Sequence, residues 1–312
     1  MADADALFAA SRRPLVLGIG GGGDVVGALA TAEACRLHHG AEPVVGGVSW
    51  ERRVIDPLPG PRSAAEIEGG RELAPGVLAA GPDTRVRENG VLFAEARMAA
   101  FLGEETVLVD VTRGPHEIAA GIEAALEALG CDLAVFVDVG GDALAHGHER
   151  GLASPLCDAL MLAAASLATV VPVLGGIFGP GCDGELTPAE VLDRVAEVAA
   201  AGGLAGARGL TPGVVERLDA AVERVPTEAS AQALRCFRGQ HGTAQIRGGR
   251  RTVQLTPVGA TTIYFDVPAA LRSAARLAAA VRDASGLEDA NEILHGLDLH
   301  TELDYEREMV DR

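Results

Sequence analysis

The stretch Pro14-Leu-Val-Leu-Gly-Ile-Gly-Gly-Gly-Gly-Asp24 opens the pattern that predicts the fold. Pro14–Ile19 is a short, continuous apolar run, which is typical of a strand buried on both faces of a sheet. Four glycines and Asp24 follow, and Asp24–His39 is predicted to form a helix. A buried strand, a glycine turn and a helix make the first half of a βαβ unit, so this stretch predicts a parallel sheet.

The same alternation of strand and helix continues along the chain. Further strands are predicted over Pro43–Val48, Thr106–Asp110, Asp132–Asp138 and Val170–Leu174. Helices are predicted over Pro115–Leu129, Pro155–Ala168 and Pro188–Ala201. Capping boxes mark two helix starts, at Ser63–Glu66 and Thr187–Glu190. The order predicts an α/β fold with a doubly wound, mostly parallel, Rossmann-like sheet.

Two segments depart from this alternation within what we expect to be a single α/β domain over residues 1–312. Residues 50–103 are rich in Pro, Gly and Arg, and we expect a long loop with short helices there. Residues 235–312 begin with predicted antiparallel strands around the turn Arg247–Arg250 and continue as helices. The acidic run Glu288–Arg312 predicts a solvated face.

The composition excludes several classes of function. The 312 residues include 26 basic and 44 acidic side chains, giving a net charge of −18, and every basic residue is Arg. Without Lys there is no P-loop lysine and no Schiff-base lysine. The acidity argues against nucleic acid and against an anionic membrane surface as partners. Five scattered cysteines favour a reducing compartment, and no long apolar run is present, so we expect a cytoplasmic protein.

Polar and glycine residues follow each predicted strand, where open parallel sheets bind ligands. The first such loop holds Gly20, Gly21, Gly22 and Gly23, which let a backbone approach an anion at the start of the next helix. Asp24 follows them and places a negative charge there. It is predicted to cap the helix, to bind a ribose hydroxyl, to hold a cation or to act in acid–base catalysis.

The loops after the second and third predicted strands offer residues for anionic groups. Glu51 lies where dinucleotide-binding folds place an acid on ribose. Arg52, with Arg53 and Arg62, is predicted to clamp phosphate, or else to balance local acids. After the third strand, Thr112, Arg113 and Gly114 suit an anion at a helix start. The alternative is that Arg113 pairs with a structural carboxylate.

The loop after the fourth predicted strand is the richest in acids. Asp138 and Asp142 flank the Gly140-Gly141 turn, so their carboxylates can converge to bind Mg²⁺ or to divide acid and base roles. Glu149 is a further candidate for catalysis, with turn capping as the alternative. Near it, His146 and His148 are weighed as transition-metal ligands against surface or substrate-contacting histidines.

Several of these motifs together resemble a known family. The motifs are Gly18–Ala28, Trp50–Arg62, Asp138–Glu149 running into Ser154–Ala159, and Thr301–Glu306. In combination they resemble the domain-of-unknown-function family numbered eleven fifty-two, which occurs in archaea and bacteria. The resemblance covers essentially the whole chain and implies one family architecture. It implies no reaction, and it carries over no catalytic residue.

The residues therefore favour an enzyme that binds a phosphorylated or nucleotide-like small molecule at the strand ends. We expect hydrolysis or group transfer assisted by carboxylates or by Mg²⁺, with no other cofactor indicated. Two alternatives stay open: a binding or regulatory protein without turnover, and an NAD-dependent oxidoreductase. The expected partner is an anionic small molecule, and we also expect a homo-oligomer.

Overall fold

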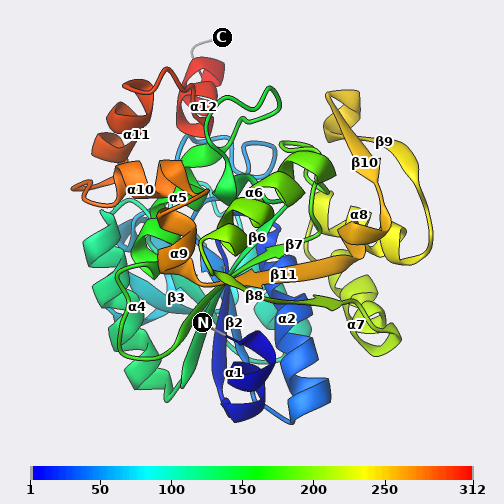
Figure 1. The fold of residues 1–312 in the computed structure, drawn as a ribbon. Helices are drawn as coiled ribbons and strands as arrows, with labels where there is room; N and C mark the ends of the chain where they lie inside the picture. The colour runs from blue at the N-terminus through cyan, green and yellow to red at the C-terminus, as the bar shows by residue number, and fades with distance from the viewer. Residues whose placement is uncertain (1–2, 311–312) are drawn as a thin grey trace.

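The computed structural model describes residues 3–310, in which a nine-stranded mixed sheet carries helices on both faces (Figure 1). The centre of the sheet is parallel, in the strand order β5-β2-β1-β6-β7. These strands are β1 (Pro14–Gly18), β2 (Val44–Val48), β5 (Thr106–Val109), β6 (Leu133–Val139) and β7 (Val173–Phe178). The doubly wound α/β fold is thus confirmed.

Each face of the sheet buries its own apolar layer. Leu15 and Leu17 of β1 pack into one layer and Val16 packs into the other, as the strand period of two requires. The first layer is covered by α4 (Pro115–Leu129), α5 (Pro155–Ala165), α6 (Pro188–Ala200), α9 (Val267–Leu271), α10 (Arg276–Val281) and α11 (Leu287–His295). The second is covered by α1 (Ala4–Ala10), α2 (Asp24–His39), α7 (Pro212–Val222) and α8 (Ala229–Phe237).

The helix starts agree closely with the sequence pattern. Both predicted capping boxes form, at Ser63 before the short helix η1 (Ala64–Glu66) and at Thr187 before α6. Pro155 is the first residue of α5, where a missing N–H costs nothing. Gly40 ends α2 in the left-handed region with φ 67°.

The predicted end of the fifth strand was wrong. The strand was predicted to stop at Leu174, but β7 continues through two glycines to Phe178. It pairs there with β11 (Thr261–Phe265), and a Cβ on Gly175 would lie 2.2 Å from the Phe265 ring. The ring fills the space of the missing side chain, so glycine marks a close contact rather than a loop.

The prediction of a loop with short helices over residues 50–103 was also wrong in part. Two antiparallel strands, β3 (Ile67–Ala74) and β4 (Val77–Val86), extend the sheet beside β5, and α3 (Ala94–Leu102) follows. The middle of β3 is exposed and carries the charged Arg71 and Glu72, with the half-buried Glu68 just before it. An edge strand of this kind has no apolar run to reveal it, and its charges discourage pairing with another chain.

The opposite edge is formed by β11 and β8 (Leu204–Gly209), both antiparallel to their neighbours. The predicted hairpin forms from β9 (Gly242–Ile246) and β10 (Arg251–Leu255), joined by η3 (Arg247–Gly249). Figure 1 shows this hairpin standing apart from the main sheet, beside α8. The helix η4 (Pro257–Ala260) leads from the hairpin to β11.

The C-terminal acids form more than a solvated face, which corrects that prediction. Glu306 in α12 (Glu302–Val310) is buried, and Glu302 bonds to the start of α5. Both carboxylates accept backbone or indole N–H groups, which is why the fold tolerates their burial. Glu308 is exposed, and Asp311 lies outside the described residues. No helix among residues 3–310 is long and apolar enough to cross a bilayer.

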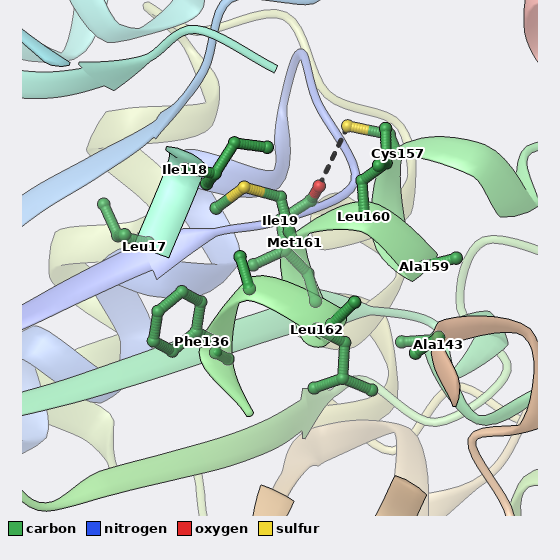
Figure 2. Close-up of a cluster of buried hydrophobic side chains, with 14 of the residues drawn as sticks. Leu17, Ile19, Ile118, Phe136, Ala143, Cys157, Ala159, Leu160, Met161 and Leu162 are labelled. Atoms are coloured by element: carbon green, nitrogen blue, oxygen red, sulfur yellow. Dashed lines mark hydrogen bonds between the residues drawn. The ribbon is translucent and has the colours of Figure 1, made fainter. Parts of the chain in front are cut away.

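The helix α5 is anchored where β1 ends. Its apolar residues, among them Leu160 and Leu162, belong to the same buried layer as Phe136 (Figure 2). At its first turn the thiol of Cys157 donates a hydrogen bond of 3.2 Å to the carbonyl oxygen of Ile19. This contact joins α5 to the residue before the glycine loop, so the next residue, Asp158, lies beside that loop.

Candidate functional site

Two carboxylate clusters lie at the topological switch point of the sheet. From β1 the chain passes to β2, forms the edge strands β3 and β4, and comes back to β5 beside β2. It then crosses to β6 on the other side of β1. The loops after β1 and β6 therefore diverge, and open α/β sheets bind ligands in such a crevice. Asp24 follows β1, and Asp138 lies near the carboxyl end of β6.

The first cluster, called here the inner triad, consists of Asp24, Asp138 and Asp158. One oxygen of each carboxylate lies within 4.8 Å of the others, and all three side chains are buried. Asp24 Oδ2 accepts hydrogen bonds from the N–H groups of Gly20 at 3.1 Å and Val139 at 3.3 Å. Asp158 Oδ1 is buried and has no hydrogen-bond partner among the described residues.

The second cluster, the outer triad, consists of Asp142, Asp183 and Glu185, with the same spacing of at most 4.8 Å. Asp183 Oδ1 is buried without a partner in the described part of the chain. A Cβ on Gly140 would lie 2.1 Å from that same oxygen. Gly140, with φ 125°, therefore gives the carboxylate its place. Glu185 accepts from Ser154 N at 2.9 Å.

Burial dominates the electrostatics of both triads. It raises the pKa of Asp24 to about 6 and that of Asp183 to about 7. Burial and the neighbouring carboxylates raise the pKa values of Asp138, Asp142 and Asp158 well above the ordinary range. Such a site favours protons or cations between its oxygens, because several adjacent anions cannot share a buried space uncompensated.

Glu185 is the exception in this group. Burial by itself would raise its pKa, but the Arg251 guanidinium and the Ser154 hydroxyl hold that pKa below the usual range. Arg251 Nη1 lies 2.7 Å from Glu185 Oε1. The outer triad therefore contains one carboxylate that stays ionised beside two that favour the neutral acid.

Residues 15–310 match the model of a family described as a protein of unknown function, DUF1152. The chain belongs to this DUF1152 family. The resemblance of its motifs is thereby confirmed, over nearly the whole chain. No curated protein and no solved structure matches the sequence.

In this DUF1152 member the fold brings together several predicted site residues. Asp24 and Asp138 share the inner triad, and Asp142 belongs to the outer one. Gly20 lies against the inner triad, since a Cβ there would be 2.6 Å from Asp24 Oδ2. Gly21, Gly22 and Gly23 complete the loop, with φ 83° at Gly21 and 52° at Gly22. Gly141 has φ 117° and packs against Val191.

Glu51 has a different environment from the one expected of a ribose-binding acid. Its carboxylate accepts the N–H of Ala94 and so caps α3. Burial raises its pKa to about 7. Next to it, Glu95 is buried with both carboxylate oxygens unpartnered among the described residues. A role for Glu51 in binding ribose stays a prediction.

Arg113 pairs with carboxylates of its own neighbourhood. Its Nη1 lies 3.0 Å from Glu117 Oε2, and its Nε lies 3.5 Å from Asp110 Oδ2. The Thr112 hydroxyl also donates to Asp110, at 2.6 Å. Gly114 packs against the C-terminal segment, since a Cβ there would lie 2.3 Å from the carbonyl oxygen of Ala284. This strand end belongs to neither triad.

The arginines beside Arg52 are also occupied. Arg62 Nε donates to Asp56 Oδ2 at 2.9 Å, and both residues are buried. Arg53 Nη2 donates to the carbonyl oxygen of Met309 at 2.9 Å. Arg52 alone of the three makes no side-chain hydrogen bond or ion pair within the described residues, and its stem lies against Gly22.

Glu149 closes its own turn. It accepts the N–H groups of His146 at 2.9 Å and Gly147 at 2.8 Å, which lowers its pKa despite the cost of burial. His146, His148 and Glu149 form a third group with metal-ligand spacing. However, Glu197 and Arg194 both contact the ring nitrogens of His146. A catalytic role for Glu149 stays a prediction.

The predicted site did not include Asp158, Asp183, Glu185 or the hairpin arginine Arg251. Nothing in the sequence singled out Asp158, because the Ser154-Pro155 helix start already explains an acidic residue in the first turn of α5. Asp183 follows β7 by five residues, so the misplaced strand end moved it away from the predicted edge. Nothing local in the sequence links Arg251 to Glu185, because only the folded hairpin brings them together.

Proposed function

We propose that this protein is an enzyme in which the two triads hold divalent cations, Mg²⁺ foremost. The cations would assist hydrolysis of, or group transfer from, a phosphorylated or nucleotide-like small molecule. Carboxylate oxygens are the ligands that Mg²⁺ prefers in proteins. Each triad offers three of them within 4.8 Å, at the strand ends where this fold class binds ligands.

One observation carries the proposal: Asp158 Oδ1 and Asp183 Oδ1 are buried without a hydrogen-bond partner in the described chain. By contrast, Asp24, Asp138 and Glu185 all accept backbone N–H groups. A buried polar atom without a partner is costly, and it is found where a ligand or ion completes the structure. Each triad contains one such oxygen.

The chemistry would follow from charge placement. A divalent cation at the triads would neutralise a phosphoryl group and make it more electrophilic. In hydrolysis, a water oxygen would bond to phosphorus while the bond to the leaving oxygen breaks, and that oxygen would take up a proton. The glycine loop would orient the substrate, because the N–H groups of Gly21 and Gly23 make no hydrogen bond in the described chain.

The first test is cation binding by isothermal titration calorimetry with MgCl₂ and MnCl₂. We expect Asp158→Asn to weaken binding at least about tenfold, because it removes a ligand charge. The matched control is Asp193→Asn in α6, whose side chain is exposed. Equal binding by both variants, or none by the wild type, would overturn the cation site.

The second test is turnover. We expect the wild-type protein to release inorganic phosphate from a panel of nucleotides, sugar phosphates and pyrophosphate only when Mg²⁺ or Mn²⁺ is added. Asp142→Asn should abolish that release while binding of the compound persists. Cation binding without any turnover across the panel would favour the alternative of a binding or regulatory protein.

A further inference from the structure

We infer that Arg52, Arg247 and Arg251 form a phosphate subsite on the rim of the two triads. The inference rests on the proposed function and narrows its substrate class. The substrate would be a phosphorylated compound whose phosphate lies between these guanidinium groups and the cations.

The three arginines come from separate parts of the chain. Arg52 follows β2, whereas Arg247 and Arg251 belong to the β9–β10 hairpin, which stands apart from the main sheet in Figure 1. Arg251 Nη1 lies 2.7 Å from Glu185 Oε1, and Arg247 Nη2 lies 3.8 Å from the same oxygen. The hairpin therefore adds two positive charges to the outer triad.

Arg52 approaches the triads from the glycine loop after β1, not from the hairpin. A Cβ on Gly22 would lie 3.2 Å from its Cγ and 3.6 Å from its Nε, so its side chain runs along the glycine loop. Its charge acts on two groups of the site. It opposes the burial that raises the pKa of Asp24, and it helps to lower the pKa of Arg247. Arg52 thus lies along the glycine loop, close enough to Asp24 and to Arg247 for its charge to act on both.

Placing these arginines together has an electrostatic cost. Arg247 and Arg251 approach the same Glu185 oxygen, at 3.8 Å and 2.7 Å, so their like charges repel each other. An arginine side chain presents a planar fork that matches two phosphate oxygens, and a dianion between such forks relieves their repulsion. Arg52 is available for this role, because its guanidinium makes no hydrogen bond or ion pair with the described residues and acts on Asp24 and Arg247 through its charge.

A simpler explanation is that the arginines only neutralise the negative charge of the triad carboxylates. It accounts for Arg251, which is paired with Glu185. It accounts only in part for Arg52, whose charge acts on Asp24 but which forms no ion pair within the described chain. Once divalent cations neutralise the carboxylates, as the proposed function requires, the positive charges of Arg52 and Arg247 are left over for a substrate anion.

The turn that carries Arg247 is held in an unusual conformation. Arg247 has φ 54°, in the left-handed region, and Gly248 and Gly249 follow with φ 65° and 84°. The Arg247 N–H donates to both carboxylate oxygens of Glu228, each at 3.0 Å. A non-glycine residue in this region is strained, and such strain is found where a side chain must be aimed.

The test measures binding of inorganic phosphate and of pyrophosphate by calorimetry, with and without MgCl₂. We expect Arg52→Gln and Arg247→Gln each to raise the dissociation constant about tenfold or more, since each removes a charge-assisted contact. The matched controls are Arg85→Gln and Arg238→Gln. Both arginines are exposed, and they pair with Glu68 and Asp219, away from both triads. The controls should bind as the wild type does.

Thermal unfolding of each variant separates lost folding from lost binding. Unchanged phosphate and pyrophosphate binding in both Arg52→Gln and Arg247→Gln would overturn the subsite. An equal loss in the controls would also overturn it, because a general loss of charge would then be the cause.

Different results would contradict the proposed function and the phosphate subsite. If Mg²⁺ binding and turnover persist while the two arginine variants bind phosphate normally, only the subsite is wrong. If the arginine variants lose phosphate binding but no cation binds and nothing turns over, the subsite stands and the enzyme proposal is wrong.

Discussion

Trp50 and Glu306, 256 residues apart in the chain, are joined by a buried hydrogen bond of 3.1 Å from the indole Nε1 to the carboxylate Oε2. The same oxygen accepts the N–H of Gly60 at 2.8 Å. Glu306 thereby ties α12 to the loop after β2, and Arg52 belongs to that loop. The C-terminal helix is in this way part of the framework that positions the candidate site.

Glu306→Ala should therefore loosen this end of the molecule. It leaves the indole N–H and the Gly60 N–H without their acceptor, which we expect to cost about 1–3 kcal/mol. Trp50 is the single tryptophan, so its fluorescence reports on this contact directly. We expect emission to shift to longer wavelength and the melting temperature to fall. A variant with wild-type emission and stability would show that the contact is dispensable.

Gly20 gives the inner triad its geometry. An Ala at position 20 would place its Cβ 2.6 Å from Asp24 Oδ2 and 3.0 Å from Asp158 Oδ2. We expect Gly20→Ala to weaken Mg²⁺ or Mn²⁺ binding about 10- to 100-fold, because the two carboxylates must move. Gly81→Ala is the control, since a Cβ there meets nothing within 4 Å. Equal cation affinities in the two variants would contradict this role of Gly20.

The stability of the cation-free protein should depend on pH. Burial raises the pKa of Asp24 to about 6, of Asp183 to about 7 and of Glu302 to about 8. In the unfolded chain carboxyl groups have pKa values of about 4, so above that pH the folded state binds more protons than the unfolded state. Stability from these groups is then complete below about pH 4 and is lost as pH rises through about 6 to 8.

We therefore expect the melting temperature in EDTA to fall between about pH 5 and about pH 8. Asp304, whose pKa several hydrogen bonds hold below its usual range, acts oppositely but only at lower pH. At about pH 8, added MgCl₂ should restore the melting temperature, since cations replace the lost protons. A flat profile in EDTA, or no effect of MgCl₂, would argue against uncompensated carboxylates at the site.

A substitution at Gly175 tests whether the Phe265 ring is the reason that β7 contains glycine there. Gly175→Ala would bring a Cβ within 2.2 Å of the Phe265 ring, which is buried between β7 and its neighbours. We expect a loss of about 1–3 kcal/mol in the free energy of unfolding, measured by urea denaturation. In β8, Gly209→Ala has its nearest contact at 4.0 Å and should be neutral. If both variants have the same free energy of unfolding, the contact with the Phe265 ring is not the reason that position 175 requires glycine.

Much of the fold was predictable because its features are local. The starts and ends of α2 and α4 agree with the sequence pattern residue for residue, since glycine and proline mark their ends. The strand β3 was not predictable, because an exposed edge strand carries charges in place of an apolar run. The candidate site was predictable in part, because Asp24, Asp138 and Asp142 lie at or just after the carboxyl ends of buried parallel strands, which meet at one edge of the sheet.

The sequence by itself determined the parallel centre of the sheet and its acidic strand ends, because periodicity and turn residues act over a few positions. Only the tertiary structure decided that Asp158 joins Asp24 and that Arg251 faces Glu185. It also decided that Arg62 binds Asp56, whereas Arg52 has no ion-pair partner among residues 3–310. These pairings depend on which helix start and which hairpin pack over the switch point. Packing between segments far apart in the chain has no local pattern in the sequence.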